Sequence, residues 1–290
     1  MPSYAHLVRG LTPPLVWDFG KRKLPGLVRA LGGHYTHIRF EGDYPNFAAA
    51  RSVSTGYDAP AILEKTRHAL LKVKRGEIRW ERDAMVSDSE EMPWALLAAL
   101  LRIAALGRKG RLRVLDFGGS LGSTYFWCRP FLRPEIDLQW HVVEQPAHVR
   151  VGRADFADEE LAFHTSIEEA LETGPFDVLL VSGVLQFLEQ PEVLLASINR
   201  WRFPHFLLDR TPLWSRQRHR LTVQHVPAEI YPASYPAWFL SRERVLALLG
   251  ETYHLRWRAP GDEHWELDGE AVQNVLWQFE AKRPEGRAVP

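Results

Sequence analysis

The segment from Arg111 to Tyr125, R-L-R-V-L-D-F-G-G-S-L-G-S-T-Y, narrows the choice of fold more than any other part of the chain. A short apolar run ends at Asp116, and glycines break it at once before helix-compatible residues resume. This order predicts a buried strand, a glycine-rich turn and the start of a helix. Glycines allow positive φ and a close approach of the backbone to a ligand, and the N–H groups that begin a helix attract negative or polar groups. The segment therefore predicts a ligand-binding turn.

The spacing of this turn separates two classes of cofactor. A dinucleotide fingerprint reads G-x-G-x-x-G, with its acidic residue at the end of the second strand. Here the turn reads G-G-S-L-G, Asp116 precedes it at the tip of the first strand, and Glu144 closes the next apolar stretch, which begins at Leu138. Acidic residues at both strand tips resemble the S-adenosylmethionine (SAM) site of class I methyltransferases. That resemblance puts Asp116 and the turn beside the methionine and ribose part, and Glu144 at the ribose hydroxyls.

Composition excludes several other classes of protein. Lys plus Arg equals Asp plus Glu at 36 each, so no global positive charge draws the 290-residue chain to nucleic acid. The single cysteine, Cys128, excludes an intrachain disulfide. No apolar run is long enough to span a bilayer, and the N-terminus lacks a signal-peptide layout, so we expect a cytoplasmic protein without a transmembrane segment.

Helical and extended patterns alternate after residue 91. A helix is predicted over Pro93 to Leu106, and further helices separate the strands that follow. This alternation predicts parallel βαβ units in a doubly wound α/β sheet of seven strands, closed by an antiparallel pair. The strands are predicted at 111–116, 138–144, 161–163, 176–181, 205–209, 253–257 and 272–279.

The chain is predicted to comprise three parts. Residues 1–90 form an N-terminal segment of helices and loops without sheet, residues 91–282 form the methyltransferase domain, and residues 283–290 form a flexible tail. The stretch 210–240 is long for a connection between a strand and a helix and is rich in proline and aromatic residues. Since long structured loops are usually functional, we expect it to cap the acceptor site.

Eight motifs extend the resemblance to a family of bacterial SAM-dependent methyltransferases that is often associated with cell-surface polysaccharide genes and has no settled substrate. The sequence is similar to that family in G-D-Y-P-N-F and S-T-G-Y-D (42–58), E-R-D (81–83), V-L-D-F-G-G-S-L-G-S-T-Y (114–125), W-H-V-V-E-Q (140–145), S-G-V-L-Q-F (182–187), D-R-T-P (209–212) and R-L-T-V-Q-H-V-P-A-E-I-Y-P-A-S-Y-P-A-W-F (220–239). The resemblance implies the class I methyltransferase fold and SAM as cofactor.

The candidate site residues follow from the strand ends and from this resemblance. The candidates for cofactor binding are Asp116, Gly118, Gly119, Ser120, Gly122, Glu144, Gln145, His164, Thr165, Ser166, Ser182, Gly183 and Gln186. The candidates for a general base are His225, His219 and Asp209, and those for acceptor binding are Tyr57, Arg210, Tyr231, Tyr235 and Trp238. Each has a purely structural alternative, such as a cap, a loop anchor or a solvated side chain. No group of residues has the spacing of metal ligands, so no metal is predicted.

The predicted function is methyl transfer from SAM to a small molecule or glycan, with a sugar hydroxyl of a surface polysaccharide as the favoured acceptor. An NAD-dependent nucleotide-sugar oxidoreductase is the enzymatic alternative, and the glycine spacing counts against it. A SAM-binding or partner-binding module without catalysis is the other alternative. The sequence leaves open whether the chain forms a homodimer.

Overall fold

The computed structural model describes residues 38–56, 59–82, 85–87, 92–107, 110–227 and 233–283. The chain divides into two compact units, and the larger one, 39–225 and 233–290, carries the sheet and the helices around it. The predicted domain boundaries at residues 90 and 282 stay predictions.

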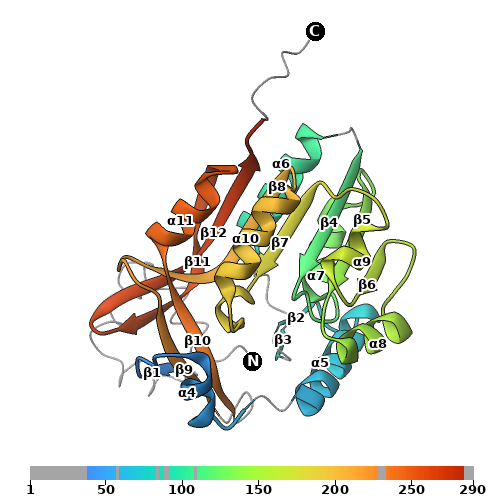
Figure 1. Cartoon of the computed structure of the whole chain (residues 1–290). Coiled ribbons are helices and arrows are strands. Elements are labelled where there is room, and N and C mark those ends of the chain that lie inside the picture. Colours follow the sequence, from blue (N-terminus) through green and yellow to red (C-terminus); the bar gives the residue numbers. More distant parts are fainter. Residues whose placement is uncertain are drawn as a thin grey trace, which may run out of the picture. The chain divides into compact units, whose positions relative to one another are not determined.

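Five parallel strands form the centre of the sheet (Figure 1). Their order across the sheet is β6 (Leu161–His164), β5 (Asp137–Val143), β4 (Arg111–Phe117), β7 (Val178–Ser182) and β8 (His205–Trp214). The sheet continues antiparallel from β8 to β12 (Glu270–Ala281) and then to β11 (Tyr253–Leu267). These seven strands are the predicted ones, and each lies within a few residues of its expected place except β8, β11 and β12, which are longer.

Helices cover both faces of this sheet because successive strand residues point to opposite sides. Leu112 and Val114 of β4 pack into one buried cluster, and Leu115 packs into the other. The first cluster includes residues of α5 (Ala59–Lys74), α6 (Trp94–Leu106), α7 (Ser123–Leu132) and α8 (Pro146–Asp155). The second includes residues of α9 (Ile167–Leu171), the 3₁₀ turn η1 (Leu185–Phe187), α10 (Pro191–Trp201) and α11 (Arg242–Gly250). The doubly wound α/β prediction is therefore confirmed. Within the described part of the chain, no helix has both the length and the apolar character needed to cross a membrane.

The sheet is wider than predicted, with ten strands among the described residues. Beyond β8 it continues with β10 (Ala233–Ser241), β9 (Arg220–Val226) and β1 (Arg39–Glu41). The expectation of a loop-rich connection after Asp209 was wrong in this respect, because β8 runs on to Trp214 and two more strands follow it. Leu221 and Val223 of β9 alternate toward a small buried cluster, which is the pattern of a strand with one buried face.

The described part of the N-terminal segment also contains strands, contrary to the prediction of helices and loops alone. β1 pairs with β9 of the main sheet, and β2 (Trp80–Arg82) pairs with β3 (Met85–Ser87) in a separate hairpin. Three-residue strands carry too little period-2 signal to be read from sequence, and these owe their form to their partners. Among the described residues before 91, α4 (Phe47–Ser52) and α5 are helical as expected.

Candidate functional site

The register of the parallel strands places four predicted residues level with one another at the carboxyl end of the sheet. Glu144 follows β5, Gly118 follows β4, Ser182 ends β7, and Asp209 lies on β8 opposite Ser182. Adjacent strands lie about 4.8 Å apart, so Glu144 and Asp209 stand roughly 14 Å from each other across three strand intervals. The strand order reverses at β4, because β5 and β6 lie on one side of it and β7 and β8 on the other. Open α/β sheets bind ligands at such a point.

The glycine turn at the centre of this row has a backbone that few side chains tolerate. Gly118, Ser120 and Gly122 all have positive φ, at 75°, 53° and 95°. A Cβ on Gly118 would lie 2.6 Å from the nearest Val184 methyl carbon, and a Cβ on Gly119 would lie 2.5 Å from a carboxylate oxygen of Asp116. The turn therefore needs glycine at 118 for both its conformation and its close packing, and at 119 for packing.

Asp116 lies beneath the turn and is almost fully buried, with 1% of its surface exposed. The indole Nε1 of Trp140 donates a hydrogen bond to its Oδ2 at 3.1 Å. Burial raises the pKa of Asp116 to about 7, and the negative charges of Glu144 and Asp209 add to this effect. At neutral pH the carboxyl group is thus poised between its two protonation states.

Glu144 stands in the row next to this turn and is half-buried. Its backbone N–H donates to the carbonyl of His164 at 3.0 Å, which ties it to the neighbouring strand. Its carboxylate accepts the backbone N–H of Gln145 at 2.7 Å and lies 4.0 Å from Nδ1 of His148. Gln145 itself is exposed and begins α8 as its N-cap. The carboxylate of Glu144 is held in place while one edge of the residue faces solvent.

The last residue of β6 and the two residues that follow it mostly contact the protein itself. Nε2 of His164 lies 2.8 Å from Nδ1 of His141, and burial lowers the pKa of His164. Thr165 donates its backbone N–H and its hydroxyl to Glu169, at 2.7 and 2.6 Å. The hydroxyl of Ser166 caps α9 by accepting the N–H of Glu169. The structure brings this segment next to Glu144 and gives its two hydroxyl groups partners within the protein.

The β7 and β8 side of the row forms a connected polar group. The hydroxyl of Ser182 donates to Oδ2 of Asp209 at 2.7 Å, and the N–H of Gly183 donates to the Asp209 carbonyl at 3.0 Å. Nε2 of Gln186 donates to the carbonyl of Arg210 at 3.3 Å, and its buried Oε1 has no hydrogen-bond partner. Burial raises the pKa of Asp209, while the bond from Ser182 and the charge of Arg210 oppose the shift. Asp209 is therefore a carboxylate whose affinity for a proton exceeds that of an exposed aspartate.

The two candidate histidines lie outside this row. His219 accepts the N–H of Ser241 at Nδ1 (2.8 Å), so Nε2 carries its proton and donates to Glu192 at 2.9 Å. Both ring nitrogens of His219 thus have structural partners. His225 lies on β9 with its Nε2 3.5 Å from a carboxylate oxygen of Glu41 on β1. Neither histidine has a contact with the glycine turn or with Asp209 among the described interactions.

Two of the four aromatic acceptor candidates are described, and they differ. Tyr235 on β10 packs edge to face against Phe187 of η1, with ring centroids 5.3 Å apart, and its hydroxyl accepts a bond from Gln224 at 3.1 Å. Trp238 donates its indole N–H to the carbonyl of Leu188 at 3.0 Å and packs into the core. Trp238 thus anchors β10, whereas Tyr235 lies next to the turn that follows β7. Tyr57 and Tyr231 lie outside the described residues.

Glu81 on β2 is not among the candidate site residues, although it belongs to the E-R-D motif of the resemblance. Only 1% of Glu81 is exposed, and its carboxylate accepts a hydrogen bond from the hydroxyl of Ser123. Ser123 is the first residue of α7, directly after the glycine turn. The signal available was the E-R-D motif itself, which composition alone could not distinguish from a solvated cluster. In the part of the chain that the structure describes, no group of three or more His, Cys, Asp or Glu residues could hold a metal ion.

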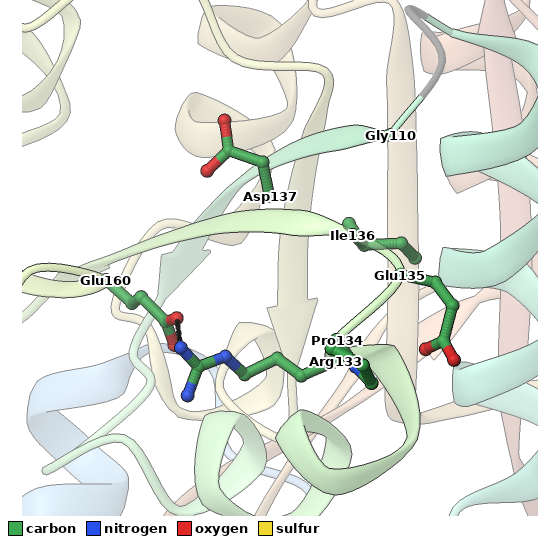
Figure 2. A pocket seen from close by; sticks show the side chains of 7 residues that line it. All are labelled: Gly110, Arg133, Pro134, Glu135, Ile136, Asp137 and Glu160. Carbon is green, nitrogen blue, oxygen red and sulfur yellow. Dashed lines mark ion pairs between the residues drawn. The ribbon is translucent and has the colours of Figure 1, made fainter.

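An open hollow of about 620 Å³ lies at the opposite, amino end of β4 and β5 (Figure 2). Figure 2 shows Arg133 and Glu160 pointing toward each other there, joined by an ion pair of 2.5 Å. Glu160 also accepts the hydroxyl of Tyr125 at 2.9 Å and lies 3.4 Å from Arg129. Since the charge of Glu160 is matched within the protein, and α/β sheets bind ligands at the other end, we assign no function to this hollow. Its lining residues are Gly110, Arg133, Pro134, Glu135, Ile136, Asp137 and Glu160.

No protein-family model matches the sequence, and no curated protein matches it significantly. Among solved structures, the chain is similar to the N-terminal domain of EvdMO1 in the presence of S-adenosylhomocysteine (SAH) and D-fucose, with a TM-score of 0.47 and 16% identity over 78% of this chain and 98% of that one. It is also similar to the N-methyltransferase NodS from Bradyrhizobium japonicum WM9 in complex with SAH (TM-score 0.39, 16% identity, 67% and 90% covered). A third similar structure is magnesium protoporphyrin IX methyltransferase (ChlM) from Synechocystis PCC 6803 with bound SAH, with a TM-score of 0.43 and 12% identity over 65% of this chain and 82% of that one. At these scores and identities, any assignment of function depends on this chain's own residues.

Proposed function

We propose that this protein is a SAM-dependent methyltransferase that acts on a hydroxyl group of a small molecule or glycan. The observation that carries the proposal is the level row of Glu144, the glycine turn, Ser182 and Asp209 across four adjacent parallel strands. It provides an acidic group for a ribose, a close-approach backbone beside it, and a second acidic group about 14 Å away for an acceptor.

The residues of the β4 and β5 side fit the nucleoside part of SAM. A carboxylate beside an open strand end accepts hydrogen bonds from a pair of ribose hydroxyls, and Glu144 is oriented for this by the N–H of Gln145. Gly118, Gly119 and Gly122 carry no side chains, so the backbone of the turn can approach a bound donor closely. The carboxyl group of Asp116 lies directly against Gly119 of the turn.

When bound, SAM would supply an electrophilic methyl group for in-line displacement by the acceptor. This chain's residues would contribute by aligning the acceptor at near-attack distance and by removing its proton. We assign the role of general base to Asp209, whose carboxylate accepts a hydrogen bond from Ser182 and whose pKa is raised by burial. His219 is a weaker candidate because both of its ring nitrogens have partners, and His225 because it lies beside Glu41.

A sugar is the acceptor we favour within this class. Tyr235 and Phe187 present aromatic rings at the β7 end of the row, and the unpaired Oε1 of Gln186 can accept a bond from a hydroxyl. Arg210 follows Asp209 directly and would contact a polar acceptor from the same strand. Rings and amide groups in combination suit a molecule with both apolar and hydroxyl-bearing edges, and a role in surface-polysaccharide synthesis extends this proposal.

The test is thermal unfolding of the purified protein with SAM, SAH and NAD in separate samples. A ligand at 100 times its dissociation constant stabilises the folded state by about 2.7 kcal/mol, which is roughly 5 to 10 °C for a domain of this size. We expect a shift with SAM and SAH and none with NAD. A shift with NAD alone would replace the methyltransferase proposal with the oxidoreductase, and tight SAH binding without transfer to any acceptor would favour a binding module.

A matched pair of variants on strand β5 tests the role of Glu144. Glu144→Gln removes the acceptor charge just beyond the carboxyl end of the strand, and we expect SAH affinity to fall about 10- to 100-fold, since hydrogen bonds to charged groups contribute about 1.5 to 3 kcal/mol. Asp137→Asn makes the same chemical change at the exposed first residue of β5 and should leave the affinity unchanged. Calorimetric titration with SAH measures both. Equal affinities for Glu144→Gln and the wild type would remove Glu144 from the site.

A further inference from the structure

Strand β2 is fixed on the first turns of helix α7 by three side-chain contacts. The ring of Trp80 stacks on Trp127 with centroids 5.1 Å apart and planes 18° from parallel, and the guanidinium carbon of Arg82 lies 4.5 Å from the centroid of the same ring. Between these two residues, Glu81 accepts the hydroxyl of Ser123. Figure 1 shows the hairpin β2–β3 close to α7 at the carboxyl end of β4. The hairpin therefore borders the glycine turn.

The position of the hairpin brings opposite charges to the turn. Glu81 carries a carboxylate with 1% of the residue exposed, at the start of α7 directly after Gly122. Arg82 carries a guanidinium close enough to Asp209 that its positive charge favours the ionised form of that carboxyl and lowers its pKa. A carboxylate and a guanidinium thus stand next to each other along the chain, and both contact the start of α7, which follows the turn directly.

This charge pair matches the end of SAM that the sheet does not account for. With the ribose at Glu144, the methionine part extends over the glycine turn, and it ends in an ammonium group and a carboxylate group. A carboxylate has about four acceptor positions, so Glu81 can bind an ammonium group together with Ser123. A guanidinium stacked on an aromatic ring keeps its N–H groups in the plane of the guanidinium, where they bind carboxylates.

We propose that the β2–β3 hairpin forms the binding site for the amino-acid end of the methyl donor, with Glu81 binding the ammonium group and Arg82 the carboxylate. The inference rests on the proposed cofactor, and it adds residues outside the parallel sheet to the cofactor site.

Two ligands that differ only at this end separate the proposal from a structural role. SAH carries the amino-acid end, whereas 5′-methylthioadenosine keeps the nucleoside and the thioether without it. Calorimetric titration of Glu81→Gln and of Arg82→Gln should show SAH binding weakened about 10- to 100-fold, with 5′-methylthioadenosine binding within twofold of the wild type. Glu144→Gln is the matched control, because losing the ribose contact should weaken both ligands.

Each alternative outcome has its own meaning. If Glu81→Gln lowers the affinity for both ligands to the same degree, the hairpin supports the turn without binding the amino-acid end, and the proposal is overturned. If it weakens neither, the proposal is also overturned, and a lower melting temperature without ligand would identify Glu81 as structural. Ser123→Ala keeps the charge of Glu81 and should reduce SAH affinity less than Glu81→Gln does. If the wild type binds neither ligand, the cofactor assignment itself has failed.

Discussion

At the amino ends of β4 and β5 the carboxylate of Glu160 is paired with neighbouring arginines, whereas at the carboxyl end of β4 the carboxyl group of Asp116 is buried beside an indole. Glu160 at the amino end has 15% of its side chain exposed and is surrounded by Arg129, Arg133 and the hydroxyl of Tyr125. Asp116 at the carboxyl end is 1% exposed, accepts the indole N–H of Trp140, and has a pKa raised to about 7 by burial. The two regions belong to one sheet, but the carboxyl group is neutralised by arginines in one and has a raised pKa in the other.

The backbone shows the same contrast at the two ends of β4. Gly110 before the strand and Gly118 after it have nearly equal φ, 79° and 75°. A Cβ on Gly110 would have no neighbour nearer than 3.9 Å, but one on Gly118 would overlap Val184. Where the fold only needs a turn, there is space around it. Where strain, tight packing and an acid with a raised pKa occur together, local stability has been given up, and such places are typical of binding sites.

The largest effect on stability that we predict comes from adding a side chain at Gly110 or Gly118. Gly110→Ala should lower the free energy of unfolding by about 1 to 2 kcal/mol, the cost of a side chain at positive φ. Gly118→Ala adds a steric overlap that costs about 1 to 3 kcal/mol more, so its total loss should be about 2 to 5 kcal/mol. Urea unfolding of both variants measures the difference. Equal losses would mean that Val184 moves aside at little cost and that the turn is no more tightly packed than its counterpart.

A smaller effect should follow the charge on Asp116. The pKa of Asp116 is about 7 in the folded protein, against an ordinary value of 3.8. Folding therefore takes up a proton when the pH lies between these two pKa values, and the free energy of unfolding falls as the pH rises from the lower to the higher. Between pH 5 and pH 8 the wild type should lose about 2 to 3 kcal/mol of its free energy of unfolding through this group. Asp116→Asn cannot titrate and should lack this loss.

The pH profile of Asp116→Asn isolates this group from others that titrate nearby. Burial lowers the pKa of His141 to about 4, and that histidine loses stability in the opposite direction as pH falls below its ordinary value. It is present in both proteins, so the difference between the two urea-unfolding profiles cancels it. Parallel profiles for wild type and variant would show that Asp116 is ionised throughout this pH range. The two ends of the sheet would then differ in backbone packing but not in the pKa of a buried carboxyl group.

The sequence predicted the central sheet well because its signals are local. The apolar run before Asp116, the glycines after it and the apolar run before Glu144 each mark a strand and its end without reference to the rest of the chain. The sheet order then brings these ends together, since parallel strands connected by helices share one carboxyl edge. The level row of Glu144, Gly118, Ser182 and Asp209 follows from residues that the sequence already singled out.

What the sequence did not reveal depends on partners distant along the chain. β1 forms because β9 offers it an edge, with Arg39 opposite His225, and no pattern within three residues shows this. Glu81 reads as a surface charge until Ser123 is placed beside it. One signal was available and unused: Asp268 and Gly269 both have positive φ in the turn between β11 and β12, and Asp-Gly favours such tight hairpins. It would have predicted the greater length of both strands.

The smallest effect we predict lies at the amino end, in the ion pairs of Glu160. Glu160→Gln keeps an oxygen for the hydroxyl of Tyr125 but removes the charge that faces Arg129 and Arg133, so the free energy of unfolding should fall by about 1 kcal/mol. This loss should shrink in high salt, because partly exposed ion pairs are screened. Urea unfolding at low and high salt measures it, and calorimetry should find SAH affinity unchanged. Weaker SAH binding in Glu160→Gln would contradict the comparison, because it would mean that the two ends of the sheet are coupled and that the matched charges of the amino end serve the ligand as well as the fold.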